Sequence, residues 1–212
     1  MKKRSWDLRR LDAALGAGLL LAMLITPLAG FGQRCAQVRQ EVLRLHILAN
    51  SDSPADQALK LRVRDAVLAE TGDLFAGAGS LEEARAAAGE NLPAIEAAAR
   101  RALAEANCDA PVKAELTRMY FNTREYGEKT TLPAGQYQAL RLSIGEAKGK
   151  NWWCVMFPPI CVPAAEAPQE EQQSPECQSA LQDIEELNQE PHYRLSFALV
   201  EWLEELGERV GS

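Results

Sequence analysis

The 212-residue sequence has only two histidines, His46 and His192, and its five cysteines form no CxxC pair. Structural zinc sites need clustered thiolate and imidazole ligands, so neither a metal nor a cofactor is expected. Basic residues are also scarce, because 23 Lys and Arg face 30 Asp and Glu and leave a net charge of -7. Nucleic-acid binding depends on basic side chains that neutralise phosphates, so this balance excludes nucleic acid as the main partner.

The first part of the chain lacks charge over a long stretch. No charged residue occurs from Ala13 to Gly32, and five basic residues precede it: Lys2, Lys3, Arg4, Arg9 and Arg10. This pattern predicts a signal peptide or a membrane anchor in residues 1–34. Both remain open, because Gly30 and Gly32 supply small residues for cleavage but an A-x-A site is absent. The basic flank should stay in the cytoplasm, so the chain after Gly32 is expected to cross the membrane.

Residues 42–49 alternate between apolar and polar side chains, which predicts a β-strand. Two helix starts follow it. Ser53 stands before a proline in the N-cap position, and Ser80 is followed by Glu83 at the spacing of a capping box. Pro93 divides the alanine-rich stretch after Ser80 into two helices, since proline lacks a backbone donor and clashes with the preceding turn.

Three further strands are predicted, at residues 112–120, 137–144 and 152–157, and the polar loop between the last two indicates an antiparallel hairpin. Residues 163–190 are rich in Ala, Pro, Gln and Glu and predict a mostly disordered linker, whereas residues 191–212 predict an amphipathic helix. The expected fold is α+β. An N-terminal strand and helices precede an antiparallel sheet, a C-terminal helix follows a flexible linker, and residues 40–162 form the exported globular domain.

Polar residues gather where the first strand meets the first helix, among them His46, Asn50 and Asp52. The alternative of a hydrolase that acts on cell-wall material would use His46 as a general base oriented by Asp52, with Ser51 or Ser53 as nucleophile. The spacing fits no nucleophile elbow, and Ser53 is already explained as a helix cap. The chain is therefore predicted not to be an enzyme, and the cluster is assigned a structural or binding role.

Aromatic residues gather in residues 151–161, where Trp152 and Trp153 are adjacent. Alternate residues of a strand point to opposite faces, so one face should join the core, and the other is either covered or a docking surface. Cys154 and Cys161 flank the end of this strand. In an oxidising compartment they are expected to form a disulfide, and the alternative is two free buried thiols.

Three segments together resemble stage II sporulation protein R, a family of endospore-forming bacteria. They are Leu45–Ser53, continued by Asp56, Gln57 and Lys60–Val67; Leu132–Leu140; and Gly149–Cys161. The likeness spans roughly residues 40–162, and it does not extend to residues 163–190.

This resemblance implies a function. Members of the family are exported from the forespore into the space between the forespore and mother-cell membranes. There they trigger a membrane-embedded aspartic protease of the mother-cell membrane, which processes the precursor of the sigma-E factor. Such a messenger needs a surface for its partner. Trp152 and Trp153, with the surface formed by His46, Asn50 and Asp52, are the expected contact residues.

Overall fold

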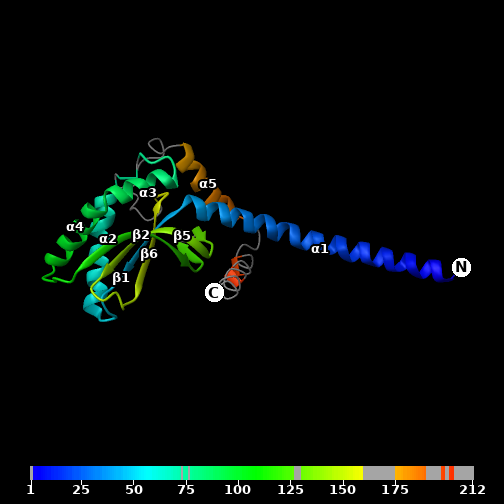
Figure 1. Cartoon of the computed structure of the whole chain (residues 1–212), viewed down its shortest axis with the longest axis horizontal. Helices are drawn as coiled ribbons and strands as arrows, with labels where there is room; N and C mark the ends of the chain where they lie inside the picture. The colour runs from blue at the N-terminus through cyan, green and yellow to red at the C-terminus, as the bar shows by residue number, and fades with distance from the viewer. Residues whose placement is uncertain are drawn as a thin grey trace.

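The structure is a computed structural model that describes residues 2–72, 74–75, 77–126, 130–159, 175–189, 197–198 and 201–202. Its elements are, in chain order, α1 (Lys2–Glu41), β1 (Leu43–Leu48), α2 (Pro54–Thr71), α3 (Leu81–Glu90), α4 (Leu92–Ala104), β2 (Val112–Phe121), β3 (Arg124–Tyr126), β4 (Thr130–Leu132), β5 (Gly135–Ile144), β6 (Asn151–Phe157) and α5 (Pro175–Gln189). Helices and strands mix without a repeating β-α-β order, which confirms the predicted α+β class (Figure 1).

The main sheet has the strand order β2-β5-β1-β6. β1 runs parallel to β5 and antiparallel to β6, so the sheet is mixed, and the predicted hairpin between β5 and β6 is wrong. The physical reason lies in β1. Its residues 43–47 are all buried, and a strand with no exposed edge needs hydrogen-bond partners on both sides. A short second sheet pairs β3 with β4, which the sequence did not predict.

Helices cover both faces of the main sheet. The first core lies between the sheet and α2, α3 and α4, and includes Leu45, Ile47, Val63, Ile95 and Leu140. The second core lies on the opposite face, where α1 and α5 meet the sheet; it includes Phe31, Val38, Tyr137, Val155 and Leu187. Alternation along β1 explains this division, because consecutive side chains of a strand point to opposite faces.

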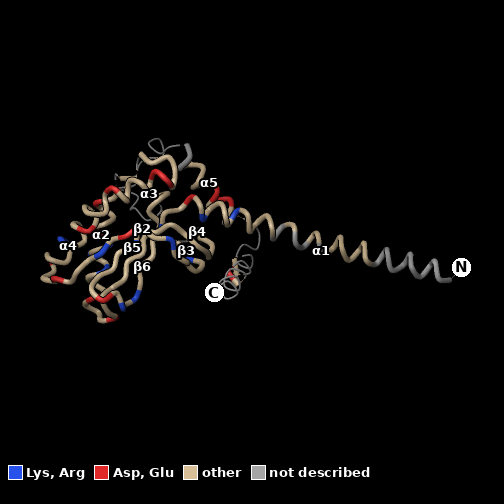
Figure 2. The backbone as a smooth tube through the Cα atoms, viewed as in Figure 1, with Lys and Arg blue, Asp and Glu red and all other residues tan. Residues whose placement is uncertain are grey.

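The helix α1 extends far from the domain with the N-terminus at its outer end (Figure 1). The described apolar side chains in the outer part of α1 are exposed; they include Leu15, Leu19 and Met23. The tan stretches of this part of the helix carry no charged residue (Figure 2). Among the helices as described, none is both long and apolar enough to count as a membrane span.

The inner end of α1 belongs to the globular domain. Phe31, Cys35 and Val38 are buried in the second core, and the helix continues through position 27 to Glu41. The buried domain therefore begins at Phe31, before the predicted boundary at residue 40, because these side chains recur at helical spacing and cover the sheet.

The helix α5 occupies part of the predicted linker, so that prediction is wrong for residues 175–189. Ala180, Ile184 and Leu187 repeat at helical spacing and are buried, which gives a polar segment enough apolar surface to order. Asn188 fixes the helix to β4, because its side chain accepts from the Thr131 amide at 2.7 Å and donates to the Thr131 carbonyl at 3.1 Å. Residues 160–174 lie outside the described part.

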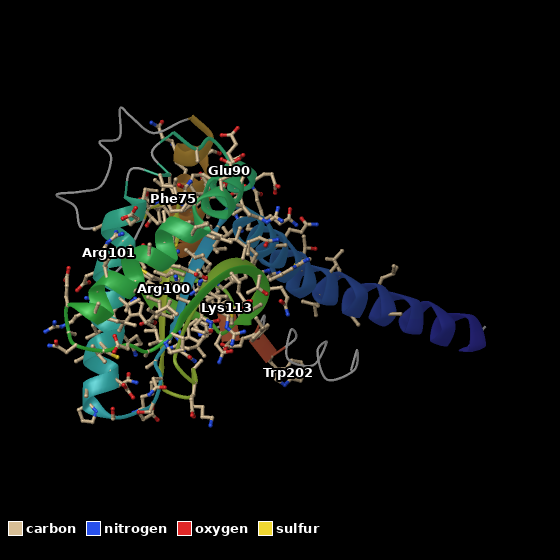
Figure 3. All side chains as sticks on the ribbon, turned by 60° about the vertical axis from the view of Figure 1, so that its left-hand side comes forward. Phe75, Glu90, Arg100, Arg101, Lys113 and Trp202 are labelled. Carbon is tan, nitrogen blue, oxygen red and sulfur yellow. The ribbon has the colours of Figure 1, made fainter. Side chains whose placement is uncertain are left out.

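The predicted helix 191–212 is described at residues 197, 198, 201 and 202 only, and these four are helical. Phe197 is buried against Phe31 of α1, with ring centroids 5.1 Å apart. Trp202 is 58% exposed and visible in Figure 3.

Candidate partner-binding surface

Trp153 lies on β6, the edge strand of the sheet, with its ring stacked flat on His46 of β1. The ring centroids are 4.1 Å apart and the planes differ by 5°. Phe121 of β2 meets the same indole edge-on at 4.8 Å, an arrangement that aromatic quadrupoles favour. Trp153 is half-buried, so one part of its ring closes the second core while the rest reaches solvent.

Trp152 points to the other face of β6, as its neighbouring position requires. Its ring packs beside the first core, and the guanidinium of Arg64 on α2 lies 4.5 Å from its centroid. This is the geometry of a cation–π contact. The two tryptophans therefore lie on opposite faces of the edge strand β6 rather than forming a single flat patch.

His46 is only 3% exposed, which corrects its prediction as a contact residue. Neither ring nitrogen has a hydrogen-bond partner, and burial lowers the pKa of His46 to about 4. The imidazole is therefore neutral near pH 7. Its function is to support Trp153. The hydrolase alternative would need Asp52 to orient His46, but no hydrogen bond joins these two side chains, and Asp52 accepts from the Lys150 backbone amide instead.

Asn50 and Asp52 join the turn after β1 to the loop before β6. The Asn50 amide group donates to Asp56 at 3.0 Å, and its oxygen accepts from the Glu146 backbone at 3.0 Å. Asp52 accepts from the Lys150 backbone amide at 2.6 Å. Both side chains therefore hold the loop before β6 in place through its backbone amides, and the side chain of Asp52 remains exposed to solvent.

Two glycines make this close approach of the two loops possible. Gly145 has φ +57°, and a Cβ there would lie 2.2 Å from the side-chain oxygen of Asn50. A Cβ at Gly149 would lie 2.2 Å from the carbonyl oxygen of Ser51. Both positions require a residue without a side chain.

Lys60 of α2 also binds the loop before β6. It is 5% exposed, and its Nζ donates to Gln57 at 2.7 Å and to the Lys150 carbonyl at 3.0 Å. Burial lowers the pKa of Lys60. Asp56 has a lowered pKa because Ser51 and Asn50 donate hydrogen bonds to its carboxylate. The polar residues Asn50, Asp56, Gln57 and Lys60 are thus bonded to one another or to neighbouring backbone groups.

Arg44 is a buried charge that the sequence reading did not identify as a special residue. It is 0% exposed, and its guanidinium lies 4.1 Å from the Phe121 ring and 4.8 Å from the Tyr137 ring. Its Nη2 donates to the Tyr126 hydroxyl, while Nε and Nη1 have no partner. Burial lowers its pKa. The only sequence feature that concerned Arg44 was the alternation along β1, which predicted that Arg44 lies on a polar, solvent-facing side of the strand rather than on a buried one.

Cys154 is disulfide-bonded, whereas Cys35 and Cys108 are not. Its predicted partner, Cys161, lies outside the described residues, so the Cys154–Cys161 pairing stays a prediction. Within the described part of the chain, no group of His, Cys, Asp and Glu side chains could hold a metal ion.

The fold and this surface define an α+β domain, extended by a long N-terminal helix, whose polar turn residues bind one another. The family model described as stage II sporulation protein R matches residues 39–167. The chain is also similar to the protein named stage II sporulation protein R of Bacillus subtilis (strain 168), at 32% identity over 186 residues, 80% of this chain and 83% of that protein. No solved structure matches. The chain belongs to the stage II sporulation protein R family, which confirms the resemblance and gives it a role in sporulation.

Proposed function

We propose that the chain is an exported signalling protein that activates a membrane-embedded aspartic protease of the mother-cell membrane. The protease then processes the pro-sigma-E precursor. The protein is made in the forespore and acts in the space between the two membranes, with residues 1–34 as a signal peptide or a retained anchor. Membership of the family is the observation that carries the proposal.

Two features of the domain support a messenger rather than a catalyst. His46 is buried and unpaired, and Asn50 and Asp52 are engaged with the loop before β6. The half-buried tryptophans flank an edge strand, and tryptophan is a residue type that often dominates the binding energy of interfaces. A messenger of this kind shifts its receptor toward the active state only by binding that state more tightly.

The test is reconstitution of the full chain with the membrane protease and its precursor. The expected result is that the precursor is shortened only when the chain is added on the extracytoplasmic side. No shortening with a folded chain would overturn the proposal.

The contact residues are tested in the same assay with a chain carrying Trp152→Ala and Trp153→Phe. Phenylalanine keeps a ring on His46, so the domain should fold, while the exposed indole surface is lost. Processing should fall at least about tenfold, as expected for loss of a tryptophan anchor. Trp202→Ala is the matched control, because Trp202 is exposed and far along the chain from β6, and it should leave processing unchanged. Full processing by the double variant would show that Trp152 and Trp153 are not contact residues.

A further inference from the structure

Two adjoining cavities lie beside the inner end of α1. The first, of about 450 Å³, is lined by Ala36, Arg39, Gln40, Leu81, Arg118, Gln136 and Gln138. The second, of about 430 Å³, is lined by Gln40, Glu41, Gly79, Ser80, Leu81, Glu82, Phe157, Ser179 and Ala180. Both are lined by Gln40 and Leu81, so they adjoin each other, and the two together are here named the α1–α3 groove. Each cavity has the size of sites that bind small ligands or short segments.

The first cavity is basic although the chain is acidic. It contains the two guanidinium groups of Arg39 and Arg118, and no carboxylate occurs among its described lining residues. The side chains of Arg118, Gln40 and Gln138 form no hydrogen bond or ion pair with any residue that the structure describes. Their donors and acceptors are therefore available to a ligand.

Two arginines outside the groove behave differently. Arg100 and Arg101 of α4 (Figure 3) are each paired with a carboxylate, at 2.6 Å from Glu96 and 3.0 Å from Glu70. The guanidinium of Arg118, which has no such partner among the described residues, presents the planar fork of donors that binds carboxylates.

Arg39 is held in place by β5. Its Nη1 donates to the Ala134 carbonyl at 2.9 Å. Its side chain lies against Gly135, where φ is +137° and a Cβ would come within 2.5 Å of the Arg39 Cδ. Only glycine leaves this space, so the Leu132–Leu140 motif orients a guanidinium toward the cavity and lowers the entropy lost on binding.

We propose that the α1–α3 groove binds an acidic peptide segment of a partner protein. A carboxylate side chain of the peptide pairs with Arg118, with Arg39 nearby. Gln40 and Gln138 bond the main-chain amides beside it, and a following apolar residue fills the second cavity. Leu81, Phe157 and Ala180 give that cavity its apolar wall. Glu41 and Glu82 line it too and disfavour a second acidic residue there. A second, partly apolar cavity next to the basic one favours a peptide over a free carboxylate.

The test measures binding of a fluorescent peptide, in which one glutamate is followed by leucine and alanine, to the full chain in detergent by fluorescence anisotropy. Arg118→Gln should weaken binding about tenfold, as expected for loss of a charge-assisted pair. Lys113→Gln is the matched control. Lys113 lies on the same strand, is exposed (Figure 3) and loses the same charge, yet it lies outside the groove, so affinity should stay within about twofold.

Three comparisons complete the test. Arg118→Lys should recover part of the affinity, because it keeps the charge but not the planar fork. Equal affinity of the Arg118→Gln and Lys113→Gln chains, or equal binding of a peptide with glutamine in place of glutamate, would overturn the site. Succinate that competes as tightly as the peptide would overturn the peptide as its ligand. The assay contains neither protease nor precursor, so its result is independent of the processing assay.

Discussion

At the scale of single residues, burial converts polar side chains into structural supports. His46 is 3% exposed beneath Trp153, and the loss of hydration keeps its imidazole uncharged. Arg44 keeps its guanidinium among aromatic rings on the same face of β1, and its titratable neighbours in the described part of the chain are Tyr126, Tyr137 and Arg124 rather than a carboxylate. Trp153, which is partly exposed to solvent, is therefore supported by the buried ring of His46.

The first prediction concerns pH. The folded pKa of His46 is about 4, against 6.5 in the unfolded chain, so the unfolded chain binds more protons between these values. The free energy of unfolding should therefore fall as pH is lowered from 6.5 to 4, by roughly 3 kcal/mol from this residue. His46→Phe retains an aromatic stack and removes the titration. Urea unfolding at pH 7 and pH 4.5 should show a weaker pH dependence for the variant, and equal dependence would contradict the assignment.

Sequence patterns identified which residues share a face of β1, but not whether that face is covered. Alternation separates Arg44 and His46 from Leu45 correctly, because the period of a strand is a local property. Their burial depends on Phe121, Tyr137 and Trp153, which come from distant parts of the chain. Asn50 and Asp52 were predicted as a polar cluster, and only the structure reveals that their partners are loop amides of residues 146 and 150.

At the scale of elements, local sequence patterns predicted where helices begin and break, but they did not predict which strands pair. Ser53 and Ser80 accept hydrogen bonds from the amides of Asp56 and Glu83, at 3.1 Å and 3.3 Å, as the capping pattern predicted. The helix break before Pro93 is also observed. The strand order was missed, because a hairpin is the shortest connection and the insertion of β1 between β5 and β6 leaves no local trace. The predicted linker wrongly included residues 175–189, because it was inferred from composition alone, and composition does not register the helical spacing of Ile184 and Leu187.

The second prediction tests the inner end of α1. A chain that begins at residue 30 retains Phe31, Cys35 and Val38, whereas a chain that begins at residue 40 exposes the surface that they cover. Each buried side chain lost costs about 1 to 3 kcal/mol, so the shorter chain should lose most of its stability. Thermal unfolding followed by circular dichroism compares the two. Equal melting temperatures would mean that α1 is only an appendage.

At the scale of the whole molecule, one sheet separates two cores. β1 supplies Leu43, Leu45 and Ile47 to the first core and lies beside β6, whose Val155 belongs to the second. Loss of packing on one face therefore disturbs strands that the other face needs.

The third prediction follows from this shared sheet. Leu140→Ala in the first core and Leu187→Ala in the second should each cost about 2 to 5 kcal/mol and lower the denaturant midpoint. In each variant, tryptophan fluorescence and far-UV circular dichroism should report the same midpoint, because the domain unfolds as a unit. Separate midpoints for the two probes would show that the cores unfold independently.

The position of β1 in the sheet also affects how the molecule is assembled. β1 ends at Leu48, yet its two neighbours begin at Gly135 and Asn151. A polypeptide emerging from a ribosome or a translocation channel N-terminus first thus presents its central strand long before either neighbour arrives. Such distant pairings form slowly. The domain would remain unfolded, and narrow enough to thread through a channel, until almost all of it has passed.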